Sequence, residues 1–131
     1  MPQTTQTAQA AEAASHYRWS ERPCETILGG VTRRFIASDR MMIGEVRLRR
    51  GDLVPLHAHP NEQFTFVVEG AMRFWCGEAD EHGRVVRSGE VIVIPANLPH
   101  RAQVLEDTLE YDIFNPPRND WLDAGDPLLR A

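Results

Sequence analysis

The sequence predicts an all-β sandwich or barrel. From about Thr32 onward, short runs of β-branched, aromatic and other apolar residues are separated by turn residues. No long stretch with the helical period lies between these runs, which favours strands over helices. The chain has 131 residues, of which 42% are hydrophobic and 25% charged, as expected for one globular domain.

The clearest strand covers residues 42–49 and is predicted to have one buried face. Two sets of side chains alternate along it with a period of two: Met42, Gly44, Val46 and Leu48, against Ile43, Glu45, Arg47 and Arg49. Further strands are expected at residues 53–59, 63–68, 71–76, 85–86, 91–94, 101–105 and 109–114. Turns at 69–70 and 106–107 are expected to separate the strands on either side of them.

The two ends of the chain differ from this pattern. Residues 1–16 are polar, without the basic start and apolar stretch of a secretion signal, and are predicted to form a flexible N-terminal tail. Residues 17–131 are predicted to form the single domain, and a cytoplasmic location is expected by default. After Asn115, two prolines exclude a strand, so the C-terminal segment is expected to be irregular, with at most one helical turn at Arg118–Leu122.

Composition and charge exclude several classes of function. A net charge of −5 argues against a duplex nucleic-acid binder, and no apolar run approaches the ~18 residues that span a membrane. All 14 basic residues are arginine, which excludes lysine Schiff-base chemistry and a P-loop. Cys24 and Cys76 are too few to staple the fold and are expected to be free thiols. The pair Arg33–Arg34 is interpreted as part of a solvated face.

Three histidines and a glutamine are the candidate metal ligands. His57 and His59 are two residues apart, so on an extended strand they share a face about 7 Å apart, and Gln63 can return to that face after a short bend. His100 begins a new strand after a proline corner. Three imidazoles and one oxygen donor suit a first-row transition metal with room for substrate or water. The alternative is that the three histidines are unrelated polar residues.

The setting of these residues resembles the two sequence motifs of the cupin superfamily. Gly51 precedes His57 by six positions and Gly70 follows Gln63 by seven. In the second motif, a glycine, an apolar strand and a proline corner precede His100; they are Gly89, residues 91–94 and Pro95. The resemblance covers residues 31–114 and implies a cupin-type double-stranded β-helix, a jelly-roll barrel whose lumen holds the metal.

The sequence departs from the cupin pattern at the ligand position that is usually glutamate. Gln63 stands there, with Glu62 just before it. A neutral amide leaves a divalent metal with its full charge, which strengthens its Lewis acidity and weakens its retention. Glu62 is the alternative ligand if the strand begins one residue earlier, although its parity directs it to the opposite face.

A polar segment follows the last predicted strands. Asp112 and Phe114 share one strand face, and Arg118 follows two rigid prolines. An acid, an aromatic wall and a guanidinium at a barrel mouth would suit a small carboxylated substrate, with the arginine gripping the carboxylate. The residues alone fit equally well an Asp112–Arg118 ion pair that pins the C-terminal segment to the barrel.

The whole set is similar to the small single-domain cupins of pectin and alginate degradation, which linearise 4,5-unsaturated uronates. This resemblance implies that His57, His59, Gln63 and His100 are metal ligands. It further implies that Asp112 is the proton-transfer residue, that Phe114 contacts substrate, and that Arg118 serves both binding and catalysis.

The expected function is therefore a metal-dependent isomerase, lyase or hydrolase acting on a small, anionic, carboxylated sugar derivative. One divalent transition metal per chain is expected: Mn, Fe, Ni, Zn, Co or Cu. The alternatives are an Fe(II)-dependent dioxygenase, a polyketide cyclase and a non-catalytic metal-dependent ligand-binding module.

A homodimer is expected, with the Arg18–Phe35 region as an exchanged edge, and no nucleic-acid or membrane partner. Five aromatic residues are expected to pack between the sheets or across the dimer interface: Phe64, Phe66, Phe74, Trp75 and Trp121.

Overall fold

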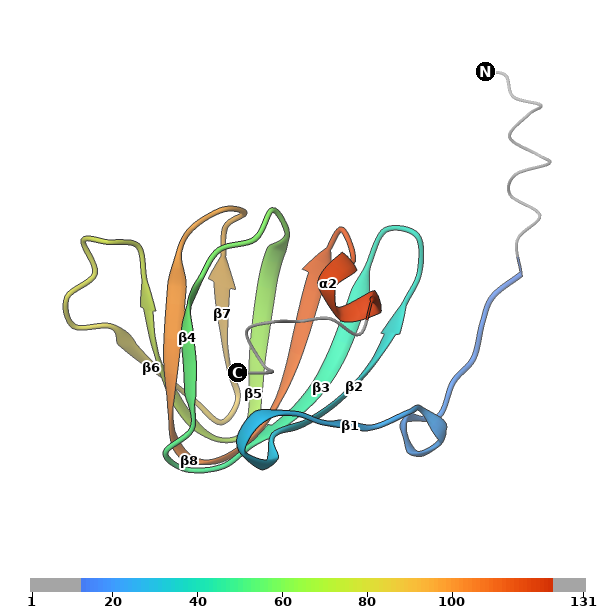
Figure 1. Ribbon diagram of the computed structural model, residues 1–131, viewed down its shortest axis with the longest axis horizontal. Helices are drawn as coiled ribbons and strands as arrows, with labels where there is room; N and C mark the ends of the chain where they lie inside the picture. The colour runs from blue at the N-terminus through green and yellow to red at the C-terminus, as the bar shows by residue number, and fades with distance from the viewer. Residues whose placement is uncertain (1–12, 124–131) are drawn as a thin grey trace, which may run out of the picture.

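Two long antiparallel strands, β5 (Glu62–Cys76) and β8 (His100–Asn115), organise the fold and pair with each other from end to end (Figure 1). The structure is a computed structural model and describes residues 13–123. The C-terminal half of β8 pairs with β3 (Met42–Leu48), and its N-terminal half pairs with β4 (Leu53–His57). Similarly, the N-terminal half of β5 pairs with β7 (Glu90–Ile94), and its C-terminal half pairs with β6 (Arg84–Arg87).

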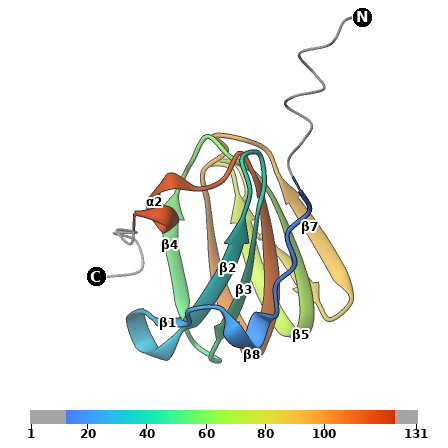
Figure 2. The ribbon, with the colours of Figure 1, turned by 90° about the vertical axis from the view of Figure 1, so that its right-hand side faces the viewer.

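This pairing creates two facing sheets. Because β5 and β8 pair with each other throughout, each has one remaining edge, and that edge changes partner halfway along. The long strands therefore bend from one sheet into the other, and the sheets enclose a lumen (Figure 2). The first sheet consists of β3, the C-terminal half of β8, the N-terminal half of β5 and β7. It is extended by β2 (Thr32–Ala37) and the short β1 (Glu25–Thr26). The predicted all-β jelly-roll fold is confirmed.

The prediction that turns at 69–70 and 106–107 separate different strands is wrong, because the chain does not reverse direction at either position. The structure has two continuous strands there, and the register between β5 and β8 shifts between Val67 and Met72. Gly70 has φ +98°, and a Cβ at this position would lie 2.4 Å from the carbonyl oxygen of Asp107. The turn-forming residues mark the corner at which the paired strands bulge and change sheet, rather than the end of either strand.

The bulge also changes which side chains face the lumen. In β5 the buried positions before the bulge are odd-numbered, including Gln63 and Thr65, whereas after it they are even-numbered, Met72 and Phe74. An extra residue reverses the alternation, as expected for a β-bulge. The buried positions of β8 are all even-numbered: His100, Ala102, Val104, Thr108, Glu110, Asp112 and Phe114.

The apolar core lies between the sheets. The fully buried members include Met42, Met72, Ile94, Val104 and Phe114, each at most 1% exposed. Burying a side chain of this size contributes roughly 1.5–3 kcal/mol, so these residues fix how the two sheets pack. The core thereby also fixes the polar positions that alternate with it along the same strands.

The aromatic predictions are confirmed in part. Phe74 and Trp121 are buried in the core. Phe64 and Phe66 are instead 42% and 37% exposed on the outer face of β5, so they do not pack between the sheets. Cys24 and Cys76 are free, as predicted.

Three short helical segments complete the described chain: η1 (Trp19–Glu21), η2 (Leu28–Gly30) and α2 (Asn119–Leu122). The single turn α2 matches the turn predicted near the C-terminal end. Residues 1–12 of the predicted N-terminal tail lie outside the described residues, and residues 13–16 are exposed and belong to no helix or strand. None of the helices within residues 13–123 has the length and apolarity to cross a membrane.

Candidate metal centre and adjoining cavity

The three predicted histidines come together at one end of the lumen. His57 is the last residue of β4, His100 is the first residue of β8, and the two are register partners. His59 lies in the connection to β5, and its ring centroid is 5.5 Å from that of His57 and 5.1 Å from that of His100. One nitrogen of each ring lies within 4.8 Å of the others, a spacing at which one ion can be held.

Each imidazole is oriented by a backbone carbonyl. His57, His59 and His100 place Nδ1 at 2.8, 3.1 and 2.8 Å from the carbonyl oxygens of Pro55, Asn61 and Leu98. A carbonyl oxygen only accepts hydrogen bonds, so Nδ1 is the protonated nitrogen and Nε2 keeps its lone pair. The carbonyl–imidazole arrangement is the usual second shell of a histidine that ligates a metal.

Burial favours the neutral forms of His59 and His100. Burial, helped by the neighbouring His57, His59 and Arg118, lowers the pKa of His100 to about 4, although the hydrogen bond that His100 donates to the Leu98 carbonyl opposes this shift. Burial, followed by the Arg118 cation, also lowers the pKa of His59. Within the described residues, the buried Nε2 of His100 has no hydrogen-bond partner. Neutral imidazoles with available lone pairs fit a divalent cation.

Gln63 faces the same point as the histidines. Its Oε1 lies 3.0 Å from Nε2 of His59, and its Nε2 donates to Oγ1 of Thr65 at 2.8 Å. Because Nδ1 of His59 carries the ring proton, two lone pairs face each other over this distance with no proton between them. Two lone pairs at this distance repel each other unless a cation binds both. This contact is therefore the strongest local indication that His59 and Gln63 fit a metal ion.

The position of Glu62 differs from that of Gln63 as strand parity predicts. Gln63 is buried and lines the lumen, whereas Glu62 is exposed on the outer face of β5. The alternative in which Glu62 replaces Gln63 at the histidine cluster therefore has no support in the geometry.

Two buried carboxyl groups lie beside this cluster. Asp112 and Glu110 are two residues apart on β8, face the lumen and hydrogen-bond to each other. Burial raises the pKa of Asp112 to about 6, against the opposing effects of Thr65, Glu110 and Arg118. Burial and the adjacent Asp112 raise the pKa of Glu110 well above its usual range. Sequence reasoning missed Glu110, although its parity with Asp112 on one strand was a usable signal.

Arg118 lies close to the predicted aromatic wall. Its guanidinium is buried, 5.2 Å from the ring centroid of Phe114, and its Nε donates to Asp120 at 3.1 Å. An ion pair joins this arginine to Asp120, two residues further along, whose own pKa is lowered overall by that cation. Asp120, which the sequence analysis did not consider, therefore pairs with Arg118; Asp112 feels the same cation, which lowers its pKa.

The interpretation of Arg33 as part of a solvated face is wrong. Arg33 is 2% exposed, donates from Nε to Glu25 at 2.9 Å and stacks its guanidinium 4.2 Å above the ring of Trp121. It is buried because β1 and α2, which are distant in sequence, cover it. Arg34 bonds to Glu45 at the sheet surface.

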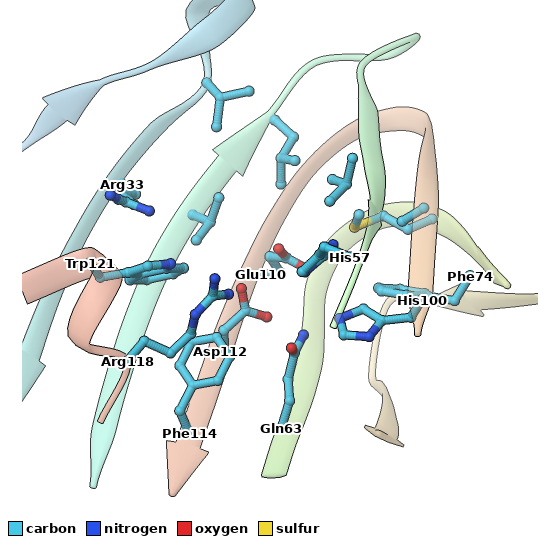
Figure 3. Close-up of a pocket in the computed structure, with 16 residues that line it drawn as sticks. Arg33, His57, Gln63, Phe74, His100, Glu110, Asp112, Phe114, Arg118 and Trp121 are labelled. Carbon is cyan, nitrogen blue, oxygen red and sulfur yellow. The ribbon is translucent and has the colours of Figure 1, made fainter. Parts of the chain in front are cut away.

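One cavity of about 70 Å³ is lined by nine of the residues described above: Arg33, His57, Gln63, His100, Glu110, Asp112, Phe114, Arg118 and Trp121 (Figure 3). His57, Gln63 and His100 lie at one end of it, and Arg33, Trp121 and Arg118 at the other. The two carboxyl groups lie between them in the view of Figure 3. A small ligand in this cavity meets Lewis-basic nitrogens at one end and cationic nitrogens at the other.

Comparisons with solved structures agree with this architecture. KdgF from Halomonas sp. is 27% identical, with 83% of this chain and 99% of that chain covered and a TM-score of 0.75. An RmlC-like cupin from Shewanella frigidimarina is 23% identical, covers 83% of this chain and 96% of that chain, and has a TM-score of 0.74. An oxalate decarboxylase from Bacillus subtilis is 17% identical with a TM-score of 0.68; this chain spans 36% of its length.

The search of curated proteins found no match. The family model described as "Cupin domain" matches residues 44–111, more than half of the chain, and includes His57, His59, Gln63 and His100. Together with the jelly roll and the histidine cluster at the end of its lumen, this confirms the predicted small cupin. The chain belongs to the cupin family.

Proposed function

We propose that this cupin is a metal-dependent enzyme that opens and tautomerises the ring of a small carboxylated sugar derivative, such as a 4,5-unsaturated uronate. The observation that carries the proposal is the buried carboxyl of Asp112, which shares one cavity with the histidine cluster and Arg118. The same segment, with Phe114 and Arg118 after Asp112, supports the resemblance to uronate-linearising cupins. Residues 17–131 would form the single catalytic domain.

One divalent transition metal would be held by His57, His59, His100 and Gln63. When bound, it would supply Lewis acidity that polarises a substrate oxygen. The neutral amide of Gln63 contributes no charge of its own, so the set of four ligands is electrically neutral and preserves that acidity. The available donors are compatible with Mn, Fe, Ni, Zn, Co or Cu.

Arg118 is proposed to orient the substrate carboxylate. Asp120 accepts hydrogen bonds from both Nε and Nη2 of Arg118 and holds the guanidinium beside Phe114, where the side chain lines the cavity (Figure 3). An arginine fork matches a carboxylate in charge and geometry. Phe114 would form the wall against which the unsaturated ring lies.

Asp112 is proposed to move the proton. Ring opening of an unsaturated uronate is an isomerisation: one proton leaves the anomeric hydroxyl, the ring carbon–oxygen bond breaks, and one proton is added to the alkene carbon. A carboxyl group whose pKa lies at about 6 is present in both forms near neutrality, so it can accept the first proton and deliver the second.

The test is turnover of the 4,5-unsaturated galacturonate monomer, followed as loss of the absorbance of its conjugated double bond. Asp112→Asn is expected to reduce kcat by about 10²–10⁴-fold, because general acid–base catalysis contributes that much, while bound metal stays unchanged. Loss of metal in this variant would instead make Asp112 a structural residue. Turnover that persists without O₂ supports the isomerase, and turnover that stops without O₂ assigns the dioxygenase alternative.

We further propose that two copies of the chain associate through the outer face of the first sheet. Phe64 and Phe66 on β5 pair in register with Val93 and Val91 on β7, and all four side chains are between 37% and 52% exposed. An apolar row on the outer face of a sheet is typical of an interface. Light scattering on the wild type and on a Phe66→Glu variant tests this: a dimer that becomes a monomer supports the proposal, and a wild-type monomer contradicts it.

A further inference from the structure

Two polar atoms that face the cavity, one in its middle and one at its cationic end, have no role in the function proposed above. Oε2 of Glu110 and Nε1 of Trp121 are both buried, and within residues 13–123 neither has a hydrogen-bond partner. Both residues line the same cavity, on the side away from His100 (Figure 3). A buried donor or acceptor without a partner is unfavourable, so such atoms mark places where a ligand or water belongs.

Trp121 is held so that its indole N–H cannot find a partner by turning. The ring lies against Gly44 so closely that a Cβ there would come 2.6 Å from Cζ3 of the indole. Phe114 packs its ring at 74° to the indole with centroids 5.1 Å apart, and Arg33 stacks above it. In Figure 3 the indole nitrogen is turned toward the middle of the cavity.

Glu110 is equally constrained. It belongs to β8, and its side chain is hydrogen-bonded to that of Asp112, while its Oε2 is left over. The pair of residues therefore offers one free acceptor, from Glu110, and one free donor, from Trp121.

The surroundings select the kind of group that satisfies both atoms. A carboxylate has no proton to donate to Oε2 of Glu110, and an ammonium group has no lone pair with which to accept from Nε1–H of Trp121. A neutral hydroxyl group meets both requirements, because it donates one hydrogen bond and accepts another.

We infer that Glu110 and Trp121 form a hydroxyl subsite, in which a substrate hydroxyl donates to Oε2 of Glu110 and accepts from Nε1–H of Trp121. The inference rests on the proposed function, since it places a hydroxyl of the same carboxylated sugar between Glu110, in the middle of the cavity, and Trp121, at the end away from the histidines. It adds a determinant of specificity: acids of similar size that lack this hydroxyl bind less well.

The experiment measures binding rather than turnover. D-Galacturonate lacks the 4,5 double bond, so opening of its ring releases no enol and the proposed tautomerisation cannot occur. Its affinity for the metal-loaded chain, and that of its 2-deoxy and 3-deoxy counterparts, is measured by titration calorimetry. The wild type is expected to bind one of the deoxy sugars about 2- to 10-fold more weakly, as the loss of a hydrogen bond predicts. Trp121→Phe keeps an aromatic ring and removes the N–H. It is expected to weaken the binding of galacturonate by a similar factor and to leave the binding of that deoxy sugar unchanged.

Glu110→Gln is the second variant, because it keeps the shape of the side chain and changes the hydrogen-bonding pattern at Oε2. It is expected to alter the same discrimination between galacturonate and the deoxy sugar, with unchanged metal content. Three results would overturn the inference: equal effects of both variants on all the sugars, no effect on any of them, or no measurable binding of galacturonate to the wild type. The two atoms would then be hydrogen-bonded to water instead. If the protein turns over the unsaturated uronate but does not discriminate between galacturonate and the deoxy sugars, only the subsite is contradicted. If it discriminates between these sugars but does not turn over the uronate, only the proposed reaction is contradicted.

Discussion

Oγ1 of Thr65 donates a hydrogen bond of 2.6 Å to Oδ1 of Asp112, which links the proposed proton-transfer residue to the candidate metal centre. The hydroxyl has one proton, so toward Gln63 it can only accept, and the amide nitrogen must lie on that side. The amide oxygen is thereby directed to His59 and the proposed ion. Thr65, which no sequence pattern singled out, sets the orientation of the Gln63 amide.

Thr65→Val is expected to weaken metal affinity or activity by about 10–100-fold, the usual effect of losing an outer-shell partner. Valine has the shape of threonine without the hydroxyl, so the amide of Gln63 loses its orientation while packing is kept. Metal affinity by competition with a chelator and kcat are the measurements. Thr65→Ser restores the hydroxyl and is expected to recover most of the loss; equal behaviour of both variants would contradict this role.

Gln63→Glu is expected to hold the metal more tightly and to turn over more slowly. The added carboxylate lowers the net charge of the site, which stabilises the bound cation and reduces its Lewis acidity. The rate of metal loss to a chelator and kcat on the unsaturated uronate check both effects. Glu62→Gln is the matched control on the outer face, and an effect of equal size there would show that the change acts through general charge rather than ligation.

Buried histidines and buried carboxyl groups make opposing contributions to the pH dependence of stability, as His100 and Asp112 illustrate. Burial lowers the pKa of His100 from 6.5 to about 4, so the unfolded chain takes up this proton first, and stability is lost as the pH falls through that interval. Burial raises the pKa of Asp112 from 3.8 to about 6, so the folded chain takes up that proton first, and stability is gained as the pH falls from 6 toward 3.8.

Asp112→Asn removes the contribution of the Asp112 carboxyl to the pH dependence of stability. The metal-free variant is therefore expected to be more stable than the wild type at neutral pH, by about 1–3 kcal/mol, and to lose stability more steeply between pH 6 and 4. Urea unfolding of metal-free protein across this range measures the difference. Parallel pH profiles for the two proteins would contradict the assignment.

Gly44→Ala is expected to destabilise the fold by about 1–3 kcal/mol, because the new methyl group would come 2.6 Å from Cζ3 of Trp121. Thermal unfolding measures the change. In a Trp121→Phe background the smaller ring leaves room for the methyl group, and the cost is expected to fall. A cost that is the same in both backgrounds would show that the methyl group meets something other than the indole.

The sequence predicts much of the candidate site because strand parity and motif spacing are local properties. His57, His59 and His100 lie together as their spacing and the cupin resemblance predict, and Gln63 rather than Glu62 faces them because of a one-residue difference in parity. Alternation along one strand likewise predicts that Asp112 and Phe114 share a face, and both side chains are buried.

The features that were missed depend on contacts between residues far apart in the chain. Arg33 belongs to a run that reads as surface, and it is buried because Trp121 and Glu25 close over it. The sequence predicts turns at the bends in β5 and β8 because the same residue types favour turns and bulges, and only the pairing of the two strands distinguishes the two structures.

The most direct test of the metal centre is elemental analysis of the purified chain after exposure to each candidate metal, together with a His100→Ala variant. One equivalent of a divalent transition metal per wild-type chain is expected, and its loss from the folded variant. A wild-type chain that retains no ion, or a His100→Ala chain that retains as much as the wild type, would contradict the metal site on which the proposed chemistry depends.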